Sequence, residues 1–317
     1  MNPIGGYFEL ELPQGEEYHN NAIRLNTGRN ALEYVLRAKQ YKMVYLPYYT
    51  CDVMLEPIKK LDLNFEFYNI DENFQPIFDF SRVKAIDVFV YTNYFGVCDN
   101  QVFKISKQCK NLIIDNSQAF FSKPLHGIDT FYSPRKFFGV ADGAYLYTNK
   151  ELEIEFEQDI SLNRVEHLLG RIEEGAEAYY QKFKKNDDSL TGQSIKGMSK
   201  LSHRMLQGID YNIAAIKRIG NFKFLHKALK ELNLLDININ NDFTPMVYPF
   251  LCENGDKLHA KLIKNKIFVA TYWPNLKGVH LFSNNFENLL INQLLPLPID
   301  QRYSIEQMKT LLEIIQT

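Results

Sequence analysis

Short runs of almost wholly apolar residues alternate with helix-length amphipathic segments in the first part of the chain. KMVYLP, NFEFYNID, AIDVFVYTN and NLIIDN have the length and composition of strands. Between them, the spacing of apolar residues predicts a helix over GRNALEYVLRAKQ that Thr27 caps, a helix from Asp52 to about Lys60, and a helix over about residues 99–110. Buried strands flanked by helices are typical of a parallel, doubly wound sheet. We therefore predict an α/β fold with a mostly parallel sheet.

The remainder of the chain predicts two more strands, a series of helices and a smaller lobe. GIDTFYS and GAYLYTN flank the segment SPRKFFGVAD, residues 151–183 have a helical pattern, and KKNDDSLTGQS is a polar break. Helical stretches follow at about 197–207 and 210–233, then strand-like MVYPFLC, IFVATYW and LLPLPI with the helices GDKLHAKLIKNK and SIEQMKTLLEII. We expect a large domain over residues 1–190, and interface helices with a small C-terminal α+β lobe over residues 191–317.

Composition narrows the function classes. The net charge is −2, with 45% hydrophobic and 23% charged residues, so the chain has a globular composition and no cationic surplus for nucleic acid. No apolar run approaches the roughly 20 residues that span a bilayer, and the N-terminus has no signal-peptide pattern. The four scattered cysteines, Cys51, Cys98, Cys109 and Cys252, are typical of reduced thiols. Together these features predict a cytoplasmic protein.

Several common catalytic motifs are missing from the sequence. It contains neither G-x-G-x-x-G after the first strand nor G-x-x-x-x-G-K-[ST], which disfavours a nicotinamide enzyme and an NTPase. Its seven histidines do not have the spacing of metal ligands. The sequence also lacks a D-x-D motif, which disfavours a glycosyltransferase. We therefore predict no metal site.

Ligands of doubly wound sheets bind outside the carboxyl ends of the strands. The residues at those ends are 47–49, 93–96 and 115–118. Asp115 ends the strand NLIID, and Lys136 lies one loop and one strand further on, in SPRKFF. Taken singly, the carboxylate is a common helix cap and the lysine a common surface residue. As a pair they are what pyridoxal phosphate requires, because a lysine binds the cofactor covalently and a carboxylate keeps its pyridine nitrogen protonated.

The chain also resembles the DegT/StrS-type nucleotide-sugar aminotransferases, which are fold type I enzymes dependent on pyridoxal 5'-phosphate. The matching stretches are LNTGRNALEYVL, VYLPYYTCDV, TNYFGV, IIDNSQAF, GIDTFYSPRKFFGVADGAYLYTN and LLPLPIDQRYSIEQM. They follow the family's order and cover nearly the whole chain. The combination of D-x-x-Q with S-x-x-K-x-x-x-x-x-D-G is the most specific part.

The resemblance assigns a role to each matching residue. It implies that Lys136 forms the Schiff base and, once released, moves the proton between substrate and cofactor carbons. Asp115 would pair with the pyridinium nitrogen, and Gln118 would contact the cofactor ring or its substituents.

The phosphate of the cofactor would be held by three further residues. The resemblance places Gly28 and Arg29 against it, and Ser133 would add a hydroxyl. Gly28 and Arg29 begin the first predicted helix, where free backbone N–H groups bind anions. An ordinary turn glycine and a solvated arginine are the alternative interpretation.

Other positions depart from the family pattern. Cys51 stands where an aromatic residue usually covers the cofactor ring, so Tyr49 or Tyr94 would take that role or the contact is absent. Asn93 replaces a frequent histidine, and Ala144 a frequent glycine.

The segment that reaches the neighbouring subunit in the family, G-x-N-Y-R, is Gly208-Ile209-Asp210-Tyr211-Asn212 here. Asp210 would repel a phosphate, which makes this contact doubtful. Tyr272 and Trp273 are packing residues or the wall of a sugar site.

The family implies an aminotransferase that moves an amino group, with glutamate as the donor, to a keto group of a nucleotide-linked sugar. It also implies a homodimer with its sites at the subunit interface. Two alternatives keep the fold. One is a sugar dehydratase, although those relatives replace the lysine with histidine. The other is a non-catalytic module that binds a ligand or regulates a partner.

Overall fold

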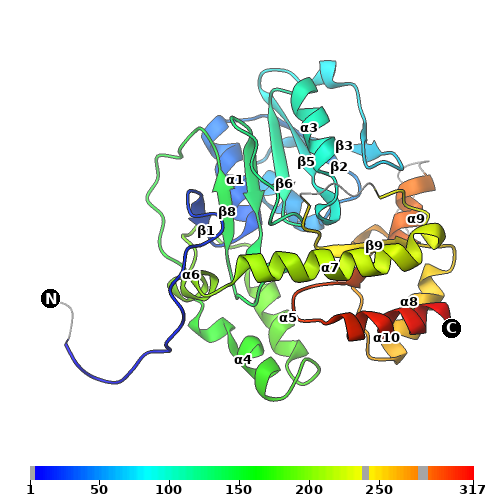
Figure 1. Cartoon of the computed structure of the whole chain (residues 1–317). Coiled ribbons are helices and arrows are strands. Elements are labelled where there is room, and N and C mark those ends of the chain that lie inside the picture. The colour runs from blue at the N-terminus through cyan, green and yellow to red at the C-terminus, as the bar shows by residue number, and fades with distance from the viewer. Residues whose placement is uncertain (1–3, 238–242, 278–284) are drawn as a thin grey trace.

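The computed structural model describes residues 4–237, 243–277 and 285–317, and its centre is an eight-stranded sheet (Figure 1). The strand order is β1-β8-β7-β6-β5-β2-β3-β4. Its strands are β1 (Ile23–Leu25), β2 (Met43–Pro47), β3 (Asn64–Ile70), β4 (Pro76–Ile77), β5 (Asp87–Thr92), β6 (Leu112–Asn116), β7 (Asp129–Tyr132) and β8 (Ala144–Tyr147). The five strands from β7 to β3 run parallel, and β8, β1 and β4 pair antiparallel at the two ends. The predicted fold class is confirmed.

Helices connect the strands and form the second half of the chain. They are α1 (Gly28–Lys39), α2 (Leu55–Lys60), α3 (Asp99–Gln108), α4 (Glu166–Glu173), α5 (Tyr180–Ser189), α6 (Lys200–Gln207), α7 (Tyr211–Leu229), α8 (Gly255–Lys264), α9 (Asn285–Gln293) and α10 (Ile305–Gln316). The first helix begins where the sequence predicts it, because the Thr27 hydroxyl accepts a hydrogen bond from the Asn30 N–H. The helix expected from Asp52 to Lys60 is present, with a 3-10 first turn at Asp52–Met54.

The two faces of the sheet carry different side chains, which explains why its strands read as continuous apolar runs. On one face Val44, Val88 and Ile113 pack with α1 and α2 in a mostly aliphatic cluster. On the other face the alternate residues, among them Tyr45 and Phe89, join a larger cluster rich in aromatic rings. Because both faces of such a strand are buried, apolar and polar residues do not alternate along it.

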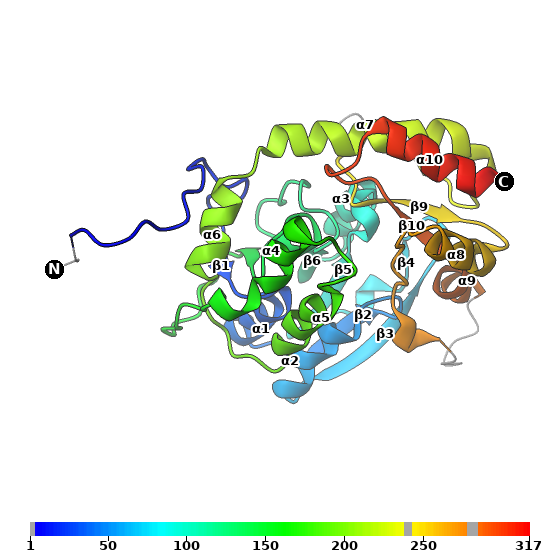
Figure 2. The same cartoon turned by 90° about the horizontal axis from the view of Figure 1, so that it is seen from below.

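The C-terminal lobe is built on a two-stranded antiparallel sheet of β9 (Val247–Leu251) and β10 (Leu294–Pro298). Helix α7 lies along one side of the molecule with α10 beside it (Figure 2). The aromatic-rich core cluster contains residues of both the large sheet and this lobe, for instance Tyr91 and Leu297. The lobe is therefore packed onto the sheet through a continuous core.

Three local predictions are wrong. Residues 151–161 are not helical, because Leu152, Ile154 and Phe156 alternate with glutamates in an extended segment. The polar break begins later than predicted, since α5 continues to Ser189. The segment IFVATYW forms no strand, and the Val269 carbonyl instead accepts a hydrogen bond from His259 of α8.

The structure describes no helix that is both long and apolar enough to cross a membrane. All four cysteines are free thiols.

Candidate functional site

Lys136 and Asp115 lie at the same edge of the sheet. Asp115 is near the carboxyl end of β6, where it pairs with Phe131 of the parallel neighbour β7. Lys136 follows β7 by one short turn, in a 3-10 helix over Pro134–Lys136. Since the carboxyl ends of adjacent parallel strands meet at one edge, the topology brings the two residues together.

Asp115 and Lys136 each have a polar group without a partner among the described residues. Asp115 is buried, and its Oδ1 accepts a hydrogen bond from the Ser117 N–H at 2.8 Å. No described residue donates to its second carboxylate oxygen. The Lys136 side chain is exposed, and its amine forms no ion pair with a residue that the structure describes. Both groups therefore have free capacity to bind something that the chain does not provide.

Cys51 lies in the electrostatic field of both groups. It follows the carboxyl end of β2 and is half-buried. Burial raises the pKa of its thiol, the positive charge of Lys136 opposes that rise, and the negative charge of Asp115 adds a smaller upward contribution. Cys51 follows β2, Asp115 lies at the end of β6 and Lys136 follows β7, so the parallel pairing of these strands places all three beside the space at one edge of the sheet.

The start of α1 borders this space. Strand β1 runs in the same direction as β7, because each pairs antiparallel with β8, so α1 begins at the same edge of the sheet. A Cβ atom on Gly28 would lie 3.7 Å from the Ser117 hydroxyl and 3.6 Å from the Phe131 ring. Among the described residues, none accepts a hydrogen bond from the Gly28 or Arg29 N–H. These N–H groups form a helix N-terminus that is ready to bind an anion.

The guanidinium of Arg29 is engaged within the chain. It forms an ion pair with Glu56 at 2.6 Å and donates to the Thr191 hydroxyl at 3.3 Å. Glu56 in turn accepts a hydrogen bond from the Gly192 N–H. The side chain thus joins α1 to α2 and to the loop after α5, and its positive charge is paired with Glu56.

Gln118 and Ser133 lie in the two loops that frame the space. The Gln118 side chain is buried and accepts a hydrogen bond from the Phe95 N–H at 2.8 Å, so it fixes the loop that follows β5. Phe95 has a positive φ of 58°, a conformation that needs such support. Ser133 is buried, and its carbonyl accepts a hydrogen bond from the Lys136 N–H. Their contacts with a cofactor stay predictions.

Of the three candidates for covering a cofactor ring, only Cys51 is partly exposed. Tyr49 and Tyr94 are fully buried, and the Tyr94 hydroxyl donates to the Tyr49 carbonyl at 2.8 Å. The Trp273 ring packs edge-on against Tyr49, with centroids 4.4 Å apart, and Tyr272 stacks on Phe95 at 6.0 Å. The aromatic residues thus join the C-terminal lobe to the loops of the site.

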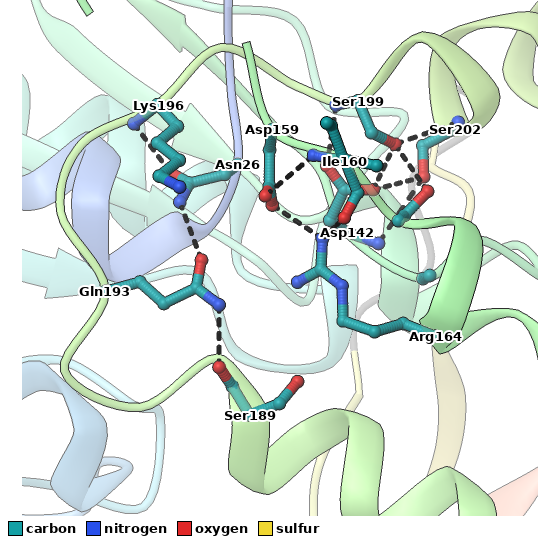
Figure 3. Close-up of polar contacts among 12 residues, drawn as sticks. Asn26, Asp142, Asp159, Ile160, Arg164, Ser189, Gln193, Lys196, Ser199 and Ser202 are labelled. Carbon is teal, nitrogen blue, oxygen red and sulfur yellow. Dashed lines mark hydrogen bonds and ion pairs between the residues drawn. The ribbon is translucent and has the colours of Figure 1, made fainter. Parts of the chain in front are cut away.

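Asp142, from the D-G part of the lysine motif, has a role that the sequence did not reveal. Its carboxylate is fully buried and accepts three hydrogen bonds, from the Ser199 N–H and from the hydroxyls of Ser199 and Ser202 (Figure 3). Ser199 also caps α6. This carboxylate therefore fixes the start of α6 against the loop that carries Lys136.

Gly143 is required by the same arrangement. Its φ is +129°, and a Cβ atom there would lie 3.1 Å from Pro134 and 3.2 Å from Met198. Pro134 is two residues before Lys136, so the glycine permits the close approach that positions the lysine loop.

Asn26 extends this polar network to the helix start. Its side-chain nitrogen donates to Gln193, its side-chain oxygen accepts from the Lys196 N–H, and its carbonyl accepts from the Gly143 N–H (Figure 3). Segment 193–199 thereby ties the residue before Thr27 to the lysine loop. No sequence motif pointed to this segment.

Two departures from the family pattern have structural explanations. Asp210 is the N-cap of α7 and accepts a hydrogen bond from the Ile213 N–H at 2.8 Å. Asn93 donates to Asp99 and Asn116 and accepts from the Cys98 N–H, so it fixes the turn after β5. In the described part of the chain, no cluster of residues is suited to a metal ion.

No family model matches the sequence, and no curated protein matches it. Solved structures do match the fold. A DegT DnrJ EryC1 StrS aminotransferase from Brucella abortus superimposes with a TM-score of 0.62 at 15% identity, over 93% of this chain and 85% of that one. DesV from S. venezuelae, solved with a ketimine intermediate, gives 0.65 at 15% identity, over 93% and 84%. The chain has the aminotransferase fold.

A Streptococcus pneumoniae protein named as a candidate sugar aminotransferase, and solved in its PLP form, gives a TM-score of 0.64 at 14% identity. This match covers 94% of the present chain and 87% of the other. A superposition of this quality shows a shared fold.

Proposed function

We propose that the protein is a pyridoxal-phosphate-dependent aminotransferase that acts on a sugar. The observation that carries the proposal is the convergence of an unpaired lysine, Lys136, and a buried carboxylate with a free oxygen, Asp115, at one edge of an aminotransferase fold. The names of the structural neighbours support the same activity.

The residues fit the cofactor at three points. Lys136 has an exposed amine for covalent attachment, Asp115 has an unused oxygen for the pyridine nitrogen, and the Gly28 and Arg29 N–H groups can receive the phosphate. Because the Arg29 side chain is paired with Glu56, we assign the phosphate contact at this position to the backbone.

Each residue then has a distinct task. The bound cofactor supplies an electron sink for the carbon that loses its proton. Asp115 would hold a proton at the pyridine nitrogen, which would keep the sink effective. Lys136 would bind the cofactor and, as a free amine, would carry a proton between the substrate and the cofactor. Gln118 and Ser133 would complete the proposed contacts, and Cys51 would lie beside the ring.

The finer assignment follows the family resemblance. We propose glutamate as the amino donor, a keto group on a nucleotide-linked sugar as the acceptor, and a homodimer as the active assembly. Free thiols at all four cysteines fit a reducing compartment, so the cytoplasm remains the proposed location.

Cofactor attachment tests the proposal directly. Protein reconstituted with pyridoxal phosphate and reduced with borohydride should carry the cofactor mass on the peptide that contains Lys136. Lys136→Ala should abolish both the attachment and the conversion of the cofactor by glutamate. Lys123→Ala is the matched control, because Lys123 is an exposed lysine in the loop between β6 and β7. Attachment that survives in Lys136→Ala would refute the proposal.

A panel of amino donors separates catalysis from simple binding. An amino donor should convert the bound cofactor to its amine form, which absorbs at a different wavelength. If the cofactor is attached to Lys136 and no donor converts it, the protein is a binding module of this fold.

A further inference from the structure

Phe137, the residue that follows Lys136, is fixed through both its carbonyl and its ring. The carbonyl accepts two hydrogen bonds, from the Gln301 side-chain amide at 2.8 Å and from the Arg218 guanidinium at 3.3 Å. The guanidinium also lies over the Phe137 ring, 4.6 Å from the ring centroid. The exposed lysine side chain therefore projects from a backbone that is anchored immediately beside it.

Arg218 is a buried cation whose hydrogen bonds to described residues all go to uncharged oxygens. The residue is 1% exposed, and burial lowers the pKa of its guanidinium to about 10, so it stays charged at neutral pH. Besides the Phe137 carbonyl, its acceptors are the carbonyls of Met246 at 2.9 Å and Pro245 at 3.4 Å, and the side-chain oxygen of Gln301 at 2.9 Å. A buried charge is stable only while its partners stay in place. Arg218 therefore resists movement of the Phe137 carbonyl.

Helix α7 also fixes the loop that carries Gln301. Asn221, which lies three residues after Arg218 on this helix, donates its side-chain amide to the carbonyls of Ile299 and Tyr303, both at 3.1 Å. These carbonyls lie two residues before and two residues after Gln301, so the loop is attached to α7 on both sides of the glutamine. Arg218 and Gln301 are thus held next to each other on one helix.

We infer that Arg218 and Gln301 are positioning residues for Lys136. The single 3-10 turn over Pro134–Lys136 does not fix the lysine by itself, because the hydrogen-bond geometry of such short turns is poor. The two donors to the Phe137 carbonyl supply the missing restraint and leave the lysine amine free. The inference rests on the proposed function and deepens it, since it makes the position of the reactive amine depend on α7 and on the loop before α10.

Cofactor affinity, measured by equilibrium dialysis against pyridoxal phosphate, tests the inference in two backgrounds. Gln301→Met removes the amide that donates to Phe137 and nearly preserves the length of the side chain. In protein with Lys136, where the amine condenses with the cofactor aldehyde and releases water, the affinity should fall about 10-fold. In the Lys136→Ala background the same substitution should change the affinity by less than about twofold, because the lysine through which it acts is gone.

Gln101→Met is the matched control. Gln101 of α3 is half-buried like Gln301, and its side-chain amide donates to the Asn73 carbonyl at 2.8 Å. This variant should leave the affinity unchanged in both backgrounds. A similar loss from Gln301→Met with and without the lysine, or no loss in the presence of the lysine, would overturn the inference.

Arg218→Lys tests the other residue of the pair. The variant keeps a positive charge but loses the planar fork that reaches several oxygens at once. Its loss of affinity should be at least about 10-fold larger with Lys136 than in the Lys136→Ala background. Equal losses in the two backgrounds would mean that Arg218 acts on the fold and not on the lysine. Thermal unfolding shows whether each variant is folded, and Gln301→Met decides the question if Arg218→Lys is not.

Failure of the proposed function gives a different result. If Lys136→Ala binds the cofactor as tightly as the unsubstituted protein, the lysine is not the attachment residue. If Lys136→Ala binds more weakly and Gln301→Met has the same effect in both backgrounds, only the positioning role is refuted.

Discussion

Two buried aspartates, Asp115 and Asp142, lie on either side of the lysine loop and accept different numbers of hydrogen bonds. Asp142 accepts three hydrogen bonds, from Ser199 and Ser202, while Asp115 accepts one, from the Ser117 N–H. A buried carboxylate is stable when its oxygens are satisfied. Asp142 meets this condition within the chain, whereas Asp115 meets it fully only with a further donor. The difference separates a carboxylate that holds the structure from one that is available to a ligand.

The largest effect is expected at Asp115. Asp115→Asn keeps an oxygen that can accept from Ser117, so thermal unfolding should be nearly unchanged. It removes the negative charge that holds a proton on the cofactor, so kcat for transamination should fall on the order of 10²–10³-fold. Steady-state kinetics and thermal unfolding measured on the same preparation check both parts. A large loss of stability would contradict this and would indicate that Asp115, like Asp142, has a structural role.

Asp142 should show the reverse behaviour. Asp142→Ala leaves two serine hydroxyls and a backbone N–H without their acceptor, and each buried unsatisfied donor costs about 1–3 kcal/mol. We expect the free energy of unfolding to fall by about 2–5 kcal/mol in denaturant titrations. Asp188→Ala, at an exposed position in α5, is the control and should change little. An equally small effect at position 142 would remove the contrast between the two aspartates.

Gly143, next to Asp142, should also be a structural position, because of its backbone conformation. Gly143→Ala forces a side chain into a positive φ and against Pro134, and such strain costs about 1–3 kcal/mol. Gly220→Ala, within α7 and with open space around it, should instead stabilise the protein by up to about 1 kcal/mol. Denaturant titration of the two variants should therefore give shifts of opposite sign.

A third aspartate, Asp210, should give the smallest effect. Asp210→Ala removes the N-cap of α7 and should cost about 1 kcal/mol, whereas Asp210→Asn should be nearly neutral because asparagine caps as well. Equal losses in the two variants would show that the charge, and not the cap, is what matters at this position.

The sequence predicted the parts of the site that depend on local patterns. Thr27 marks the start of α1, Asp115 lies at the end of the apolar run that forms β6, and Lys136 follows the apolar run that forms β7. Strand β1 was not predicted, because three residues give no periodicity. The helix predicted over 152–156 is absent, because Leu152, Ile154 and Phe156 alternate with glutamates, a two-residue period that is typical of an extended chain.

Contacts between distant residues could not be read from the sequence. Asp142 and Ser199 are joined only by the fold, and serines and aspartates are common in every loop. The ion pair between Arg29 and Glu56 could not be predicted either. Because of this pair, we assign the phosphate contact to the backbone and not to the Arg29 side chain. The exposure of Tyr7 and Phe8 could not be predicted either, because an apolar residue does not show in the sequence whether it is buried.

The central claim is that Lys136 and Asp115 bind one cofactor, the first through a covalent bond and the second through a proton. The most direct test is ¹⁵N NMR of borohydride-reduced protein loaded with pyridoxal phosphate that is labelled at the ring nitrogen. With the label attached at Lys136, the account predicts a protonated ring nitrogen at pH 8 in the unsubstituted protein and a neutral one in Asp115→Ala. A neutral nitrogen in the unsubstituted protein, or the same protonation in both proteins, would contradict it.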